Sequence, residues 1–156
     1  MSRVLVTPHF FADEFDSHDD VPYPPEWIAD RLTPLCRVLE RVRLELGNTP
    51  CSIVSGYRSP THNAELRAND LATKGESGVA QNSQHPQGRA ADVSFVARKP
   101  ALVLATALRL QAAGELPELG GIAGYPGWVH FDVRPKPADG HLARWTGKGF
   151  GSEPVA

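Results

Sequence analysis

The ten residues 83–92, Ser-Gln-His-Pro-Gln-Gly-Arg-Ala-Ala-Asp, constrain the fold of this chain more than any other stretch. The run Ala90–Phe95 has the small and apolar composition of a strand, and a strand would carry Asp92 inward on one face. A turn that contains Gly88 could fold His85 back toward Asp92. An unpaired carboxylate is costly to bury, so Asp92 needs a partner.

A second histidine lies in another strand-like run, residues 128–133. Alternation along a strand predicts a core face and an opposite face that is exposed or functional. The core face would carry Val129, Phe131 and Val133, and the opposite face would carry Trp128, His130 and Asp132.

Two histidines and one carboxylate, with a fourth position open, are typical of catalytic zinc sites. The sequence therefore suggests a zinc hydrolase site built from His85, Asp92 and His130. Two alternatives remain: Asp92 pairs with an arginine, either Arg58 or Arg89, and His130 lies on an exposed polar strand face.

Arg58 follows the run Cys51–Ser55, whose composition predicts a short buried strand. At the end of a strand it could point into a cleft and hold a substrate carboxylate or a developing oxyanion. The alternative is an ordinary surface arginine.

The length of 156 residues predicts a single domain spanning 1–156, with its core between about 7 and 146. The apolar fraction of 41% is that of an ordinary soluble protein, and the net charge of −2 gives no indication of a nucleic-acid partner. The longest apolar stretch, Ala101–Ala113, is too short to span a membrane and is broken by polar residues. Cys36 and Cys51 are expected to be reduced.

Residues Met1–Phe10 lack the apolar core of a signal peptide. We therefore expect the chain to be cytoplasmic as synthesised, and to reach any target outside the cell only after export or release.

Periodicity and turn residues predict the elements around the site. Pro34 either starts a new helix or kinks a longer one. The expected helices are Glu26–Leu46, one from Ser59-Pro60 to about Ala68 with Ser59 as its cap, and one from Lys99-Pro100 to Ala113. The further expected strands are Leu119–Ala123 and Trp128–Arg134, which would pair antiparallel. The expected loops are residues 69–82, exposed and mobile, and the tail after Pro135, anchored by Trp145.

Three motifs resemble those of the zinc D-alanyl-D-alanine carboxypeptidases and related murein endopeptidases. The first is Ser83-x-His85-x-x-Gly88-x-Ala90-x-Asp92, the second spans residues 55–63, and the third runs from Gly120 through Tyr125 to Val129-His130-Phe131-Asp132. The opening segment, Phe10–Phe15 with the long helix after it, is similar to the branch that includes phage-type lytic enzymes. The likeness covers about residues 7–146.

The resemblance implies an α+β fold, in which a small antiparallel sheet carries the zinc and helices pack against it. It implies hydrolysis of peptide bonds in peptidoglycan stem peptides, often next to a D-amino acid. His85, Asp92 and His130 would bind Zn²⁺, and Arg58 would contact the substrate or the transition state. We expect peptidoglycan peptides as partners, no nucleic acid, no stable membrane insertion and a monomer.

The chain departs from this family pattern at Gly127. Many members carry Glu or Asp three residues before the last zinc histidine as the general base, and a glycine cannot take a proton. Asp132 is the nearest substitute for the base, unless it only orients His130. Ser83 and Tyr125 would bind substrate. The alternative function is a non-catalytic zinc-containing module that binds cell wall or belongs to a phage particle or secretion machine.

Overall fold

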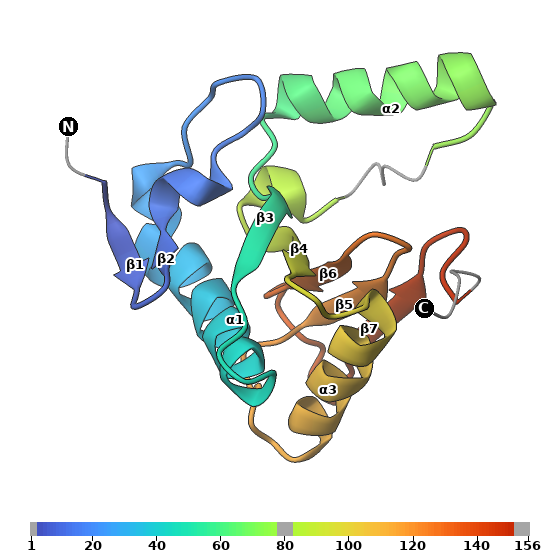
Figure 1. Cartoon of the computed structure of the whole chain (residues 1–156). Helices are drawn as coiled ribbons and strands as arrows, with labels where there is room; N and C mark the ends of the chain where they lie inside the picture. The colour runs from blue at the N-terminus through green and yellow to red at the C-terminus, as the bar shows by residue number, and fades with distance from the viewer. Residues whose placement is uncertain (1–2, 78–82, 152–156) are drawn as a thin grey trace.

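A mixed five-stranded sheet with helices packed against it forms the body of the computed structural model, which describes residues 3–77 and 83–151. Within these residues the strand order is β3-β4-β6-β5-β7 (Figure 1). The predicted α+β class is confirmed. The strands are β3 Cys51–Ser55, β4 Ala90–Phe95, β5 Gly121–Gly124, β6 Val129–Asp132 and β7 Ala143–Thr146.

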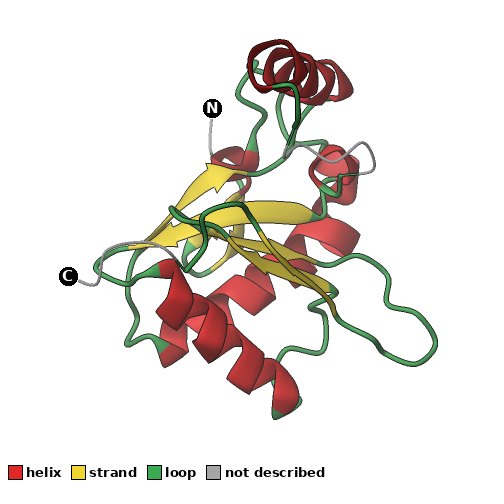
Figure 2. Ribbon diagram, turned by 90° about the vertical axis from the view of Figure 1, so that its right-hand side faces the viewer, coloured by secondary structure: helices red, strands yellow, loops and turns green. Residues whose placement is uncertain are grey.

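Two helices, α1 (Thr33–Glu45) and α3 (Pro100–Ala112), pack on one side of the sheet (Figure 2). Between them and the strands lies a buried apolar core, because one face of each central strand is apolar. Its fully buried side chains include Leu39, Val93, Leu110, Ile122 and Phe131. The face of the sheet away from these helices is left for polar side chains.

The chain enters α1 through tighter and wider helical turns. A 3₁₀ turn, η2 (Pro25–Trp27), is followed by a π turn, η3 (Ile28–Leu32). The segment predicted as one helix over Glu26–Leu46 is helical, but its first turns are 3₁₀ and π, and the α-helix begins at Thr33. Pro34 lies in the first turn of α1, where a missing N–H costs nothing. A new α-helix therefore starts at Thr33-Pro34, as the first of the two alternatives for Pro34 predicts, and it follows η3 without a gap.

The second helix is longer than its sequence pattern indicates. α2 runs over Pro60–Lys74, and the hydroxyl of Ser59 caps it by accepting from the backbone N–H of His62, as predicted. The predicted end near Ala68 and the loop over residues 69–74 are wrong. α2 buries little apolar surface, so its last turns need no apolar periodicity; an ion pair of Asp70 with Lys74 lies there. The remaining loop prediction, at residues 78–82, lies outside the described residues.

The predicted irregular tail contains a strand. β7 pairs with β5 in parallel, at the edge of the sheet, and is mostly exposed. An edge strand without an apolar face carries no alternation that would reveal it in sequence. β3, predicted as buried, is the other edge strand and exposes Val54.

The N-terminal segment packs against the core through two of its phenylalanines. A small sheet of β1 (Leu5–Thr7) and β2 (Phe10–Phe11) leads into a 3₁₀ turn, η1 (Ala12–Phe15). Phe10 and Phe15 are buried. The two cysteines are free thiols, and the described part of the chain has no helix long and apolar enough to cross a membrane.

Strand register arranges the polar face of the sheet. Ser55, Asp92, His130, Ala123 and Trp145 are successive partners, so they form one row across all the strands. Since paired residues point to the same face, this row gathers side chains from distant parts of the sequence.

Candidate metal centre

A short turn delivers His85 to the sheet. Residues His85–Gln87 form a 3₁₀ turn, η4, which ends at Gly88 with a φ of 69°. That left-handed conformation suits glycine and turns the chain directly into β4. The hydroxyl of Ser83 accepts from the backbone N–H of His85 at 3.2 Å, which holds the start of the turn.

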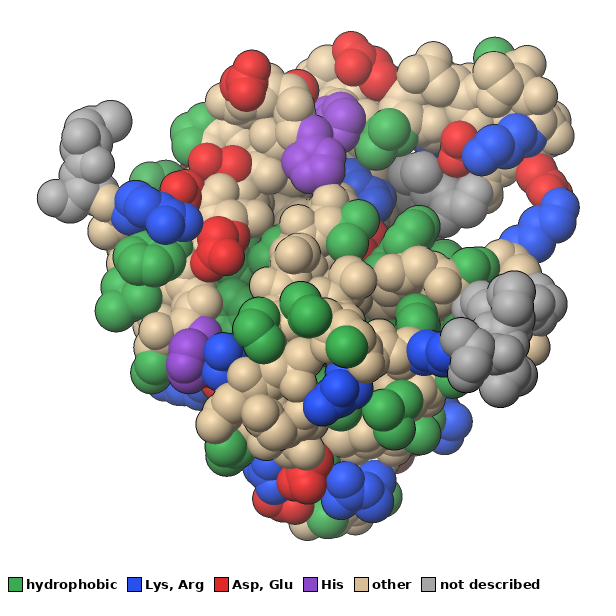
Figure 3. Space-filling model, in the orientation of Figure 1, with side chains coloured by type: hydrophobic (Ala, Val, Ile, Leu, Met, Phe, Trp, Pro, Cys, Tyr) green, Lys and Arg blue, Asp and Glu red, His purple; other side chains and the backbone are tan. Residues whose placement is uncertain are grey.

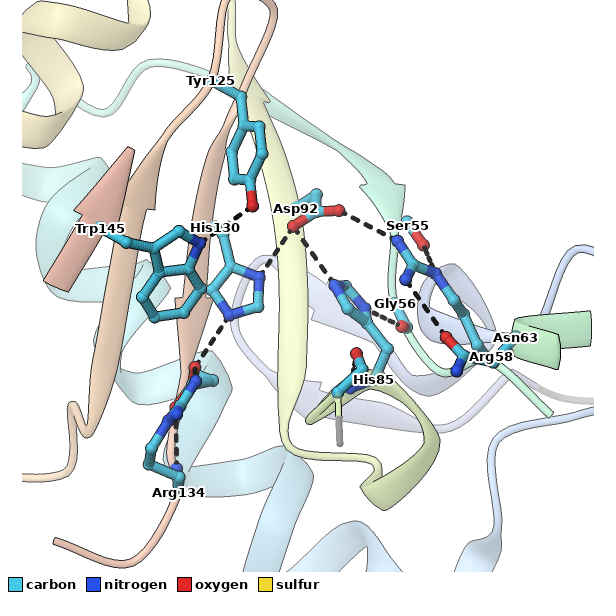
Figure 4. Close-up of polar contacts among 12 residues, drawn as sticks. Ser55, Gly56, Arg58, Asn63, His85, Asp92, Tyr125, His130, Arg134 and Trp145 are labelled. Carbon is cyan, nitrogen blue, oxygen red and sulfur yellow. Dashed lines mark hydrogen bonds and ion pairs between the residues drawn. The ribbon is translucent and has the colours of Figure 1, made fainter. Parts of the chain in front are cut away.

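Asp92 lies between the two histidines. Its Oδ1 is 3.0 Å from Nδ1 of His130 and 3.3 Å from Nε2 of His85 (Figure 4). One ligand atom from each residue lies within 4.8 Å of the others, and all three residues are buried. The structure therefore brings together the three metal ligands expected from the sequence.

The outer nitrogen of each imidazole is held by an acceptor. Nδ1 of His85 donates to the carbonyl oxygen of Gly56 at 2.7 Å, and Nε2 of His130 donates to Oδ2 of Asp132 at 2.8 Å. These acceptors assign the tautomers, because each leaves a lone pair on the nitrogen that faces Asp92. Two oriented lone pairs and one carboxylate oxygen fit a zinc ion with one position left for water or substrate.

The electrostatics of the cluster suit a cation. Burial lowers the pKa of His85, which favours its neutral, metal-binding form. Burial alone would raise the pKa of Asp92, but the adjacent imidazoles of His130 and His85 outweigh it and hold that pKa well below its usual range. Asp92 is thus a permanent negative charge among neutral or positive neighbours.

Arg58 lies beside Asp92, on the side opposite His130 (Figure 4). Its Nη2 is 3.4 Å from Oδ2 of Asp92, its Nε donates to the hydroxyl of Ser55 at 3.1 Å, and its Nη1 approaches Oδ1 of Asn63 at 3.5 Å. The side chain is 14% exposed. The arginine partner considered for Asp92 is therefore present together with the histidine cluster, and Arg58 is not a free surface residue.

Asp132 lies behind His130. It is fully buried, and Arg134 binds its carboxylate through Nε at 2.8 Å and Nη2 at 2.7 Å. Burial would raise the pKa of Asp132, but Arg134 and His130 lower it to about 2. His130 and Asp132, on the polar face of β6, are therefore buried rather than exposed.

Aromatic side chains line the other side of His130. Trp145 lies with its ring centroid 5.1 Å from that of His130, and its Nε1 donates to the hydroxyl of Tyr125 at 3.0 Å. The Tyr125 hydroxyl points toward the space beside Asp92 (Figure 4). The surface is hollowed below α2 in the space-filling view (Figure 3).

Several site residues were not anticipated from the sequence. They are Ser55, the carbonyl of Gly56, Asn63 and Arg134, while Trp145 was expected only as an anchor. Arg134 could have been found, since the strand predicted over Trp128–Arg134 puts positions 130, 132 and 134 on one face, although β6 itself ends at Asp132. The others come from a strand end, a helix start and an edge strand that only the fold brings close. Gly127 is exposed in the β5–β6 turn.

Neighbouring strands and a turn bring two histidines and one aspartate into a buried group that could hold a metal ion, which is the donor set of a metal-dependent protein. The sequence profile of the peptidase M15 family matches residues 16–132, which is most of the chain. The chain belongs to the peptidase M15 family, the family of the zinc D-Ala-D-Ala carboxypeptidases, and its buried His85, Asp92 and His130 could bind the metal ion. A comparison with curated proteins finds no match.

Proposed function

We propose that the protein hydrolyses peptide bonds in peptidoglycan stem peptides next to a D-amino acid, with zinc as its cofactor. One observation supports catalysis most strongly: the Asp92 carboxylate meets His85 and His130 through one oxygen and Arg58 through the other. The guanidinium of Arg58 therefore lies beside the metal position. The substrate class rests on the motifs shared with the murein peptidases.

The residues have distinct roles in this proposal. His85, Asp92 and His130 hold the metal, which when bound supplies a Lewis acid and activates water for attack on an amide. Arg58, held by Ser55 and Asn63, directs its donors to the negative charge that develops on the carbonyl oxygen.

Ser83 and Tyr125 are the proposed substrate contacts. The indole N–H of Trp145 occupies a lone pair of the Tyr125 hydroxyl, so the hydroxyl proton is free to donate to a peptide group. Ser83 lies next to the metal ligand His85. The protein would act as a monomer on the cell wall, after export or release.

Single-histidine variants test the proposal. His85→Ala and His130→Ala should each lose zinc and stop releasing peptide from purified murein, because each removes one of three ligands. Zinc is measured by metal analysis of the purified protein and peptide release by chromatography. His141→Ala is a matched control, since His141 is exposed and outside the site. Hydrolysis by either ligand variant, or by chelator-treated protein, would overturn the proposal.

A non-catalytic zinc module that binds cell wall is the second candidate. Gly127 favours it, because the acid that many related enzymes use as general base is missing there. Co-sedimentation with murein and a product assay on the same sample separate the two functions. Binding without any released peptide would favour the module.

A further inference from the structure

We propose that Asp132 and Arg134 are positioning residues that set the tautomer and ring orientation of His130 for metal binding, and that Asp132 does not accept the proton of the attacking water. The inference rests on the metal site of the proposed function. Of the two roles considered for Asp132, general base and orientation of His130, it assigns the second.

Asp132 lies on the side of the His130 imidazole that faces away from Asp92. Oδ2 of Asp132 is 2.8 Å from Nε2 of His130, whereas Nδ1 of the same ring faces Asp92 at 3.0 Å. The two nitrogens of an imidazole point in diverging directions. The ring of His130 therefore separates Asp132 from the place where the metal and its water would sit.

The hydrogen bonds of Asp132 with Arg134 and His130 use the acceptor sites of its carboxylate, so none is left for a water on the metal. Oδ1 accepts from the backbone N–H of Arg134 at 3.1 Å and from its Nε at 2.8 Å. Oδ2 accepts from Nη2 of Arg134 at 2.7 Å and from His130. A carboxylate offers about four acceptor sites, and these contacts use them. A general base needs an oxygen open to the reacting water.

The fold leaves space for the Asp132 carboxylate next to Gly121 and buries it. Asp132 pairs in register with Gly121 on β5, and a Cβ at Gly121 would collide with both carboxylate oxygens. Trp145 packs against both partners of this carboxylate, with its ring centroid 5.2 Å from the guanidinium carbon of Arg134 and 5.1 Å from the ring centroid of His130. The Asp132 side chain is fully buried in this setting.

Such an arrangement changes metal affinity. A carboxylate that accepts from the outer N–H of a ligating histidine fixes its tautomer and raises its basicity, and losing that partner costs about 10- to 100-fold in metal affinity. Arg134 compensates the buried negative charge, so it should contribute through Asp132 rather than by contact with the metal.

The test measures zinc affinity of the folded protein by competition with a chromophoric chelator. Asp132→Ala should bind zinc about 10- to 100-fold more weakly. Asp132→Asn should lose less, because its amide oxygen can still accept from Nε2–H. Arg134→Ala should also bind zinc more weakly. Asp139→Ala is the control, since Asp139 accepts only a backbone N–H of a nearby loop, and its affinity should be unchanged.

A second readout guards against loss of folding. The visible spectrum of the cobalt-substituted Asp132→Asn protein should differ from that of wild type, because a neutral amide leaves the His130 ligand less basic than a carboxylate does. Unchanged zinc affinity together with an unchanged cobalt spectrum in Asp132→Asn would overturn the inference. If activity fell while metal binding stayed the same, Asp132 would act as the general base instead. Failure of wild type to cleave murein would overturn only the proposed activity, because the affinity comparison does not depend on turnover.

Discussion

Asp92 and His130 are directly paired in register on β4 and β6, with Oδ1 of the aspartate 3.0 Å from Nδ1 of the histidine. Two of the three candidate metal ligands are therefore fixed by sheet geometry, and His85 depends on a turn. A pair held by backbone hydrogen bonds on both strands loses little conformational entropy when it binds a metal.

Gly121→Ala should destabilise the protein by about 1–3 kcal/mol and weaken zinc binding, because the new methyl group would collide with the carboxylate of Asp132. Thermal unfolding and chelator competition measure the two effects. Gly127→Ala is the matched control, since a Cβ at Gly127 meets nothing within 4 Å. Equal effects of the two substitutions would contradict the packing seen around Asp132.

Arg58→Lys should lower kcat on a murein peptide by about 10²–10³-fold, because a lysine cannot reproduce the fork that Ser55 and Asn63 orient. Zinc content should stay near wild type, since Arg58 is not among the ligands. Arg37→Lys, on an exposed arginine far from these contacts, should leave both unchanged. A fall in zinc content equal to the fall in activity would assign Arg58 a structural role instead.

Cys36 and Cys51 should resist alkylation in the folded protein at about pH 8, because the thiolate is the reactive form. Burial raises the pKa of Cys51 to about 12 and raises the pKa of Cys36 well above its usual range. Mass spectrometry after iodoacetamide treatment should show neither thiol labelled in buffer and both labelled in denaturant. Rapid labelling of Cys36 in buffer would show that the core around α1 opens.

Glu40 should contribute stability that depends on pH. It accepts from the ring and the backbone N–H of His9 at 2.7 and 2.8 Å. Burial would raise its pKa, but these contacts outweigh it and lower the pKa from 4.5. Because the folded-state pKa is the lower one, the stabilisation is present above pH 4.5 and is lost as the pH falls through the folded value.

Glu40→Gln should therefore lower the unfolding free energy by about 0.5–1 kcal/mol near pH 7, a modest amount because His9 is half-exposed. The difference from wild type should disappear near pH 3. Denaturant unfolding at both pH values measures it, with Glu65→Gln as an exposed control on α2. A difference that grows on acidification would contradict the lowered pKa.

The placing of Asp92 and His130 in one buried group could be predicted from sequence because both lie in strands with strong local patterns. Ala90–Phe95 and Val129–Asp132 carry apolar residues on one face, and that pattern alone orients Asp92 and His130 to the other face. The start of α2 at Ser59 and the turn at Gly88 also follow from local chemistry, namely a capping hydroxyl and a left-handed glycine.

The extent of α2 and the presence of β7 could not be predicted in this way. Both are largely exposed, so no apolar periodicity marks them. The position of Trp145 over His130 could not be predicted either. It depends on the parallel pairing of β7 with β5 and on the small side chain of Ala123, which lies between His130 and Trp145 in the row across the sheet.

The amino-acid sequence by itself determined which side chains could bind a metal and which faces of their strands they occupy, because burial pattern and turn chemistry are local properties. Tertiary structure alone decided the partners of those side chains: Gly56 behind His85, Arg58 beside Asp92, and Asp132 with Arg134 behind His130. The physical reason is register, since only the pairing of β3, β4, β6, β5 and β7 determines which distant residues come within hydrogen-bonding distance.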